Sequence, residues 1–211
     1  MKIIISETTA PEANLAREKA FLTECPGQDV LFLYINSPSV IVGRNQLPEA
    51  EADLFYCAKH HIPVIKRLSG GGTVYHDLGN INYSFIVEAP KKHILDRDFL
   101  TPVVDALKSF GIDAVVGSRK ELLVNGEKIS GTASHISRGR QLFHGTLLFD
   151  TDLGHLYHAL NGNKSLRGKH VSSIPSPVTN ISGLLDKKIT APEFMERLAV
   201  FFDGYFNKPS L

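Results

Sequence analysis

The chain has 211 residues, slightly more than a typical single domain, and we expect one compact domain over residues 1–211. Hydrophobic residues make up 43% and charged residues 21%, a balance that excludes a disordered chain. Lysine and arginine number 23 against 22 acidic residues, so no overall field attracts nucleic acid or an anionic membrane. An anionic ligand therefore has to be met by a local cluster of cations.

The two cysteines and the N-terminal residues predict a cytoplasmic protein. Cys25 and Cys57 form neither a CxxC motif nor a framework of bridges, which fits a reducing compartment. The apolar residues 3–5 are too few for a signal peptide, and no apolar run approaches the roughly 18–20 residues that cross a bilayer. We therefore expect neither secretion nor a membrane span.

The N-terminal half predicts strands and helices in alternation. Residues 3–5 read as a strand and 11–22 as a helix with Pro11 in its first turn. Two apolar runs, 30–35 and 40–42, flank a short polar turn and predict a strand pair. Further strands are expected at 63–65 and 80–87, separated from that pair by one helix over 48–60 with acidic residues in its first turns.

The C-terminal half contains the strongest turn signals. Asn125-Gly126 suits a two-residue primed turn and predicts a hairpin, and a second hairpin is expected through residues 137–140. Residues 161–180 are polar and basic without periodicity, which predicts a long loop. Helices are expected over 98–110 and 192–206. We predict a mixed α/β (α+β) fold with largely antiparallel sheets flanked by helices.

A glycine-rich segment carries an unusual density of polar groups between apolar strands. Lys66 and Arg67 precede Ser69 and the three glycines Gly70–Gly72. Consecutive glycines let the backbone approach a ligand and present N–H donors, as anion-binding sites require. Neither the P-loop spacing nor the dinucleotide fingerprint is present. Taken alone, the three glycines favour a plain glycine-rich hairpin.

The segment RLSGGGTVYHDLGNINYSF, which begins at Arg67, resembles the lipoate-binding signature of lipoate–protein ligases. Lys66 replaces the first arginine of that pattern. Five further segments resemble the family in the expected order along the chain. They are residues 14–18, 42–46, 128–131 (Lys-Ile-Ser-Gly), 144–148 (His-Gly-Thr-Leu-Leu) and 178–180 (Val-Thr-Asn).

This resemblance implies a biotin/lipoate ligase-like fold and an ATP-dependent enzyme that makes lipoyl-AMP and transfers the lipoyl group to a lysine. The implied acceptors are apo lipoyl domains of 2-oxoacid dehydrogenase E2 subunits or the glycine-cleavage H protein. ATP and Mg²⁺ are the implied co-substrate and metal, with Glu121 as a ligand of the metal. Many such ligases carry a C-terminal accessory domain, and we expect residues 1–211 to correspond to the large catalytic domain alone.

The resemblance also implies roles for individual residues. Lys128 is expected to be the catalytic lysine that contacts the activated carbonyl and the phosphate. Lipoate contacts are implied for Arg44, Arg67, Ser69, Gly70, Gly71, Gly72, His76 and His144. Nucleotide contacts are implied for Val74, Tyr75, Asp77, Asn80, Glu121, Lys128, Thr146 and Lys169.

Two features keep alternative readings open. The basic loop with Lys164, Arg167 and Lys169 is either a lid over an adenylate or a solvated linker. Arg119-Lys120-Glu121 replaces the family's Arg-Asn-Asp and loses the asparagine, which bears on the nucleotide and metal contacts there. We also expect no metal site made of histidines, since no HExxH or Cys/His spacing is present.

Two alternatives to a complete ligase remain. The first is an octanoyl or lipoyl acyltransferase that uses a carrier-protein donor, but Cys25 and Cys57 lie outside the motifs that would supply its nucleophile. The second is a lipoate-binding subunit that needs a separate accessory protein, which the retained Lys128 argues against.

Overall fold

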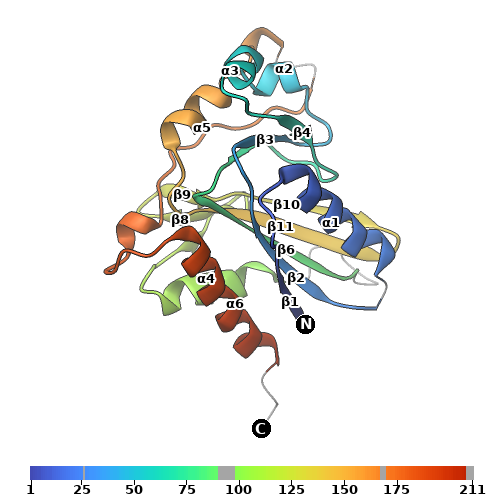
Figure 1. Cartoon of the computed structure of the whole chain (residues 1–211), viewed down its shortest axis with the longest axis vertical. Helices are drawn as coiled ribbons and strands as arrows, with labels where there is room; N and C mark the ends of the chain where they lie inside the picture. The colour runs from blue at the N-terminus through green and yellow to red at the C-terminus, as the bar shows by residue number, and fades with distance from the viewer. Residues whose placement is uncertain (26, 90–97, 167–169, 208–211) are drawn as a thin grey trace.

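The computed structural model of the chain describes residues 1–25, 27–89, 98–166 and 170–207. Three sheets and six helices are found among these residues (Figure 1). The largest sheet has the strand order β1-β2-β6-β11-β10, and all its pairs are antiparallel except β1 with β2. Its strands are β1 (Lys2–Ile5), β2 (Val30–Ile35), β6 (Asn80–Glu88), β10 (Thr132–Ser137) and β11 (Arg140–Leu148).

Two small sheets complete the strand arrangement. The sheet β4-β3-β5 joins β3 (Ser39–Val42) in parallel with β4 (Val64–Lys66) and antiparallel with β5 (Val74–His76). The antiparallel sheet β7-β8-β9 contains β7 (Val115–Val116), β8 (Leu122–Val124) and β9 (Glu127–Ser130). The predicted mixed, largely antiparallel fold class is confirmed.

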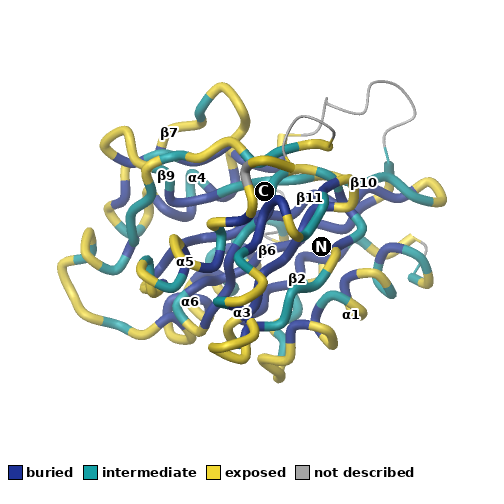
Figure 2. The backbone as a smooth tube through the Cα atoms, turned by 90° about the horizontal axis from the view of Figure 1, so that it is seen from above, coloured by how far each residue is buried: buried dark blue, intermediate teal, exposed yellow. Residues whose placement is uncertain are grey.

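Helices cover both faces of the large sheet. The helices α4 (Leu100–Ser109) and α6 (Ala191–Asn207) lie together against one face, where they enclose the main apolar core. Helix α1 (Pro11–Glu24) packs on the opposite face. The central strands are accordingly buried and the outer loops exposed (Figure 2). Three short helices lie beside the β4-β3-β5 sheet: α2 (Pro48–Glu51), α3 (Leu54–Lys59) and α5 (Leu153–Ala159).

Both predicted hairpins are present, with the expected backbone geometry. Asn125 and Gly126 have φ values of 52° and 83°, and Arg138 and Gly139 have 50° and 74°. Two consecutive positive φ values are what a type I′ turn requires. Local chemistry therefore decided these connections.

The expected pairing of residues 30–35 with 40–42 is wrong. Strand β2 pairs with β1 and β6, whereas β3 pairs with β4 and β5 in a separate sheet. The polar connection is therefore a link between two sheets and not a hairpin turn.

The single helix expected over 48–60 is also wrong. Ala52 is extended, with φ −116° and ψ 140°, and this ends α2. The Asp53 side chain then accepts a hydrogen bond from the Tyr56 N–H at 2.9 Å and caps α3.

Helix α6 begins with a reciprocal capping box between Thr190 and Glu193.

The described residues of the segment 161–180 form the long loop that its composition predicted, apart from the short 3₁₀ turn η1 (Lys164–Leu166). A second 3₁₀ turn, η2 (Ser182–Leu184), follows it. Arg167 and Lys169 lie outside the described residues. No helix of the described ranges is long and apolar enough to cross a membrane.

Candidate functional site

Two adjoining cavities lie between the large sheet and the β4-β3-β5 sheet. The first, of about 350 Å³, is lined by Arg67, Gly71, His76 and His144 among others, and we call it the glycine-loop cavity. The second, of about 300 Å³, is bounded by Tyr75, Leu148 and three residues at α5, and we call it the α5 cavity. Both cavities are lined by Thr73, Val74, Lys128, Gly131, Thr146, Ser173 and Ile174.

Arg67 shapes the glycine loop from inside. Its Nη2 donates to the carbonyl oxygens of Gly70 and Gly72 at 2.6 and 2.7 Å, and its Nη1 to that of Ile41 at 3.0 Å. Burial lowers the pKa of Arg67 to about 10, although Glu18 raises it in part, so the guanidinium keeps its charge at neutral pH. The loop carbonyls are thereby turned inward by a buried cation.

The backbone of the glycine loop approaches its neighbours very closely. A Cβ at Gly43 would lie 2.2 Å from the Gly71 oxygen, and Gly71 itself has φ +83°. Among the described residues, no acceptor is found for the N–H groups of Gly70, Gly71 and Gly72. These donors fit the anion-friendly loop that the sequence suggested.

A chain of buried hydrogen bonds runs from His144 to Arg67. Glu18 Oε1 lies 2.9 Å from His144 Nδ1, and His144 Nε2 lies 2.7 Å from Ser69 Oγ, which accepts from Arg67 Nε at 2.9 Å. Burial alone raises the pKa of Glu18, but His144 and the hydroxyl of Ser84 outweigh it, so the pKa falls below 4.5. The ring of His144 is thus held between a carboxylate and a hydroxyl.

His76 is the second histidine of the glycine-loop cavity. It is buried, and its Nδ1 lies 2.9 Å from Asn36 Nδ2. Burial, together with the charges of Arg67 and His144, lowers its pKa from 6.5 to about 3. The ring is therefore neutral at physiological pH.

Lys128 lies on β9 where the two cavities meet. Residues 177–179 run beside it: the Lys128 N–H donates to the Pro177 oxygen at 2.9 Å, and the Lys128 oxygen accepts from the Thr179 N–H at 3.1 Å. A Cβ at Gly131 would lie 3.1 Å from Lys128 Nζ, so the glycine leaves room for the ammonium group. Burial and the charge of Arg119 lower the pKa of Lys128, and Glu121 partly opposes them.

Ser173 holds the loop that follows residue 169 against residues at the cavity walls. Its Oγ accepts from the Thr73 N–H at 2.8 Å and from Gln46 Nε2 at 3.1 Å. Its own N–H lies 3.2 Å from both carboxylate oxygens of Glu51. We refer to these contacts as the Ser173 latch.

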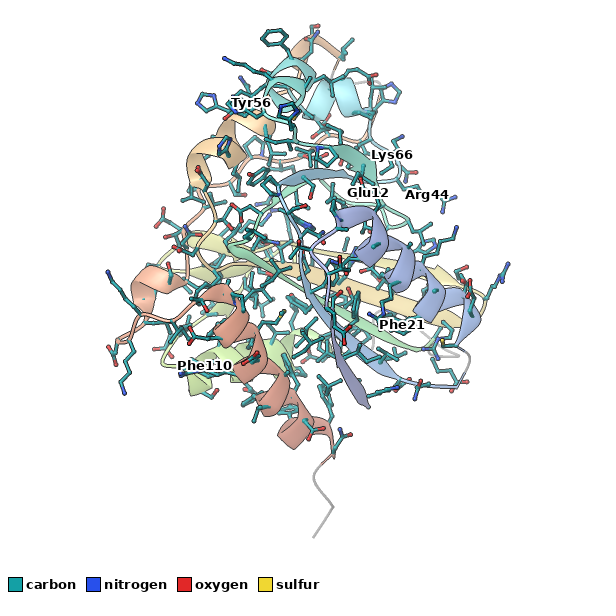
Figure 3. All side chains as sticks on the ribbon, viewed as in Figure 1. Glu12, Phe21, Arg44, Tyr56, Lys66 and Phe110 are labelled. Carbon is teal, nitrogen blue, oxygen red and sulfur yellow. The ribbon has the colours of Figure 1, made fainter. Side chains whose placement is uncertain are left out.

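The structure gathers most of the predicted site residues but leaves several away from the cavity walls. Arg44 is exposed and lies at the periphery, as does Lys66 (Figure 3). The Asp77 carboxylate accepts from the N–H groups of Gly79 and Asp152, and the Asn80 amide donates to Asn82. Neither Asp77 nor Asn80 lines a cavity, and Lys169 lies outside the described residues.

The remaining predicted residues divide between the two cavities. Gly71, Gly72, His76, His144, Arg67 and Glu121 line the glycine-loop cavity, and Tyr75 lines the α5 cavity. Ser69 and Gly70 support the loop through Arg67. Val74, Lys128 and Thr146 line both cavities.

Sequence reasoning missed four residues that hold the site: Glu18, Asn36, Gln46 and Ser173. Glu18 and Gln46 fell inside the quoted motifs, but nothing in their spacing pointed to His144 or to a loop more than a hundred residues away. The sequence offered one signal, the carboxylate of Glu18 in the middle of a helix. The structure shows that this position is buried, where an unpaired carboxylate is rare.

The fold of this chain is similar to that of solved lipoate protein ligases. A structure of an archaeal lipoylation system, a bi-partite lipoate protein ligase and its E2 lipoyl domain from Thermoplasma acidophilum, superposes with a TM-score of 0.82 at 28% identity, covering 98% of this chain and 83% of that chain. Two more structures have TM-scores of 0.79 and 0.78, each at 26% identity, and each comparison covers 98% of this chain and 85% of the other. One is from T. acidophilum with bound lipoic acid; the other is lipoate-protein ligase A bound with ATP.

Sequence comparison identifies the family. Residues 10–203 match the lipoyl protein ligase A/B catalytic domain, and the chain belongs to this family. It is 41% identical to lipoate-protein ligase LplJ of Bacillus subtilis over 191 residues, which cover 89% of this chain and 58% of the relative. The chain thus spans about three-fifths of the length of such relatives.

Proposed function

We propose that this chain activates lipoate with ATP and transfers the lipoyl group to a lysine of an acceptor protein. The observation that carries the proposal is the position of Lys128, which lines both cavities where they meet. A cation at such a junction faces the atoms that join an acyl group to a phosphate. An ammonium there stabilises negative charge that develops during both acyl activation and acyl transfer.

The two cavities suit the two halves of an acyl adenylate. Lipoate occupies the glycine-loop cavity, between Arg67, His76 and His144, with its carboxylate at Lys128. The nucleotide occupies the α5 cavity, beside Val74, Tyr75 and Thr146. The solved relatives with bound lipoic acid and bound ATP support lipoate and ATP as the two ligands.

Two displacements complete the reaction. A lipoate carboxylate oxygen attacks the α-phosphorus of ATP, the bond from that phosphorus to the bridging oxygen breaks, and pyrophosphate leaves. The acceptor amine then attacks the acyl carbon, the bond to the AMP oxygen breaks, and the amine loses a proton. Lys128 and the N–H groups of the glycine loop contribute positioning and charge, with no covalent intermediate on the protein.

Mg²⁺ enters this proposal only as the counter-ion of the ATP phosphates. The Glu121 carboxylate already accepts from the Arg119 N–H at 2.8 Å, and no described group of three His, Cys, Asp or Glu side chains is placed to hold a metal ion. Glu121 as a metal ligand remains a prediction, as do the nucleotide contacts of Asp77, Asn80 and Lys169. No step is assigned to the metal.

The acceptor is an apo lipoyl domain of a 2-oxoacid dehydrogenase E2 subunit or the glycine-cleavage H protein, in the cytoplasm. The archaeal relative, which belongs to a lipoylation system with an E2 lipoyl domain, supports this class of acceptor. The same relative is a bi-partite lipoate protein ligase, which supports supplying a separate accessory protein in the assay. Cys25 and Cys57 line neither cavity, which disfavours an acyltransferase with a cysteine nucleophile.

The test separates the two half-reactions. Purified chain, lipoate, Mg-ATP and an apo lipoyl domain are combined with and without an accessory chain, and both pyrophosphate release and the mass of the acceptor are followed. We expect pyrophosphate and a lipoylated acceptor in equal amounts. Transfer from supplied lipoyl-AMP without pyrophosphate release, even with the accessory chain, would overturn the activation step. Modification by an octanoyl carrier protein without ATP would identify an acyltransferase.

A further inference from the structure

One ring nitrogen of His76 is buried and finds no partner in the part of the chain that the structure describes. Its Nε2 has no hydrogen-bond partner among the described residues, although the ring lines the glycine-loop cavity. A buried polar atom without a partner is unfavourable and calls for an explanation. Whether Nε2 is a donor or an acceptor depends on which ring nitrogen carries the proton.

A chain of hydrogen bonds that starts at Asn14 determines which ring nitrogen of His76 carries the proton. Asn14 Nδ2 lies 3.0 Å from the Thr8 oxygen and 3.4 Å from the Ile35 oxygen. Backbone carbonyl oxygens only accept hydrogen bonds, so this end of the Asn14 amide must be its NH₂ group. Asn14 Oδ1 meanwhile accepts from Ser6 Oγ at 2.6 Å, which agrees with that orientation.

The orientation of Asn14 fixes Asn36. Asn14 Nδ2 also lies 2.8 Å from the Asn36 side chain, so the atom it meets must be the acceptor Oδ1. Asn36 therefore turns its NH₂ group toward His76 Nδ1, at 2.9 Å. His76 Nδ1 has to accept that hydrogen bond, and the single proton of the neutral ring belongs on Nε2.

His76 lines the glycine-loop cavity alone of the two cavities, whereas Lys128 also lines the α5 cavity, so the two residues lie at different parts of the glycine-loop cavity. Arg67 and His144 are the charged or titratable groups that act on His76, whereas Arg119 and Glu121 act on Lys128. With the carboxylate of an acyl chain at Lys128, as the proposed function has it, His76 faces the far end of that chain.

We infer that Asn36 is a positioning residue that fixes His76 as an Nε2–H donor, and that this donor selects an acyl chain whose far end carries a hydrogen-bond acceptor. The dithiolane ring of lipoate offers sulfur atoms, which accept weakly. A saturated chain such as octanoate offers only a methyl group and leaves the N–H unpaired. The inference rests on the proposed function for the identity of the ligand, but the tautomer itself does not.

The wild-type protein provides the first test. Nitrogen-15 NMR of the histidine side chains, with the His76 signal assigned by its loss in His76→Gln, should show the proton on Nε2. Addition of lipoate should shift that signal, and octanoate should shift it much less and bind about threefold to tenfold more weakly. A proton on Nδ1, or equal affinities and shifts with the two acids, would overturn the inference.

Asn36→Asp supplies the second test, at pH 8.5 so that the ring stays neutral. A carboxylate at this position only accepts, so the His76 proton moves to Nδ1 and Nε2 becomes an acceptor. The preference for lipoate over octanoate should then fall to less than twofold, while octanoate affinity changes little. Asn180→Asp is the matched control, because Asn180 Nδ2 donates to the Thr151 oxygen away from both cavities.

The outcomes separate the two proposals. If the wild-type protein binds neither acid, the proposed function fails, while the tautomer is still decided by its spectrum. If Asn36→Asp does not fold, the wild-type spectrum and the two affinities remain decisive. An Asn36→Asp protein that folds, shows the Nδ1 tautomer and keeps the lipoate preference would refute the selecting role of His76.

Discussion

Gln46 and Ser173, 127 residues apart in sequence, are joined by a hydrogen bond of 3.1 Å from Gln46 Nε2 to Ser173 Oγ. Gln46 Oε1 in turn accepts from the Gly43 N–H and from Thr73 Oγ1, at 3.1 and 2.9 Å. One side-chain amide thus ties the turn after β3, the end of the glycine loop and the long loop together. Ser173, and with it the long loop, lines both cavities.

Ser173→Ala removes the hydroxyl from the Ser173 latch. We expect the loop at 170–176 to exchange its amide hydrogens faster and the affinity for lipoyl-AMP to fall about tenfold, because two donors lose their acceptor. Hydrogen exchange by mass spectrometry and calorimetric titration measure the two effects. Ser165→Ala, an exposed serine of the same loop, is the control. Unchanged exchange would mean that the latch does not hold the loop.

Lys128→Ala should reduce lipoyl transfer from supplied lipoyl-AMP by roughly 10²–10³-fold, the usual effect of losing one group that stabilises developing negative charge. Rapid-quench measurement of single-turnover transfer separates this step from binding. Lys188→Ala removes an exposed lysine that lines neither cavity and should react like wild type. Wild-type transfer by Lys128→Ala would show that the junction cation is not catalytic.

Gly43→Ala tests the close approach that shapes the glycine loop. The new Cβ would lie 2.2 Å from the Gly71 oxygen and 2.9 Å from Gln46 Oε1, so the loop must move. We expect a loss of about 1–3 kcal/mol in the free energy of unfolding and weaker lipoate binding. Urea denaturation and titration with lipoate measure these changes. Gly183→Ala, which meets no atom within 4 Å, should change neither.

The low pKa of His76 predicts a specific pH dependence of stability. In the unfolded chain His76 takes up a proton near its ordinary pKa of 6.5, whereas the folded protein resists protonation until about 3. Unfolding therefore binds a proton between these values, and stability falls as the pH drops from 6.5 toward 3. His76→Asn should show a shallower decline in urea midpoints over this range. Parallel curves for the two proteins would contradict the buried neutral histidine.

The fold class and both hairpins could be predicted because their signals are local. Asn125-Gly126 sets its own turn, and the alternation in residues 80–87 places Tyr83 and Phe85 on the face that packs against α4 and α6. The break at Ala52 was missed although Asp53, a common capping residue, stood in the expected helix. Asp53 belongs to the acidic residues of the expected first turns, so the pattern over 48–60 favoured one uninterrupted helix.

The supporting residues of the site could not be predicted because their partners are distant in sequence. Glu18 reaches His144 across 126 residues, and Ser173 reaches Thr73 across 100. The motifs placed Arg67 and His144 in one site, but its hydrogen bonds depend on how three sheets and α1 meet. The spacing of residues along the sequence does not indicate these contacts between distant elements.

The link between β2 and β3 is short, polar and contains a proline, which is the usual profile of a loop that tolerates insertions. In this fold it is the joint between two sheets: Asn36 at its start contacts Asn14 of α1 and His76 of β5, and the Ser37 N–H donates to the Thr9 oxygen at 2.7 Å. Lengthening this link would separate the sheets that enclose the glycine-loop cavity. The most ordinary-looking turn of the chain is therefore among the segments least free to change in length.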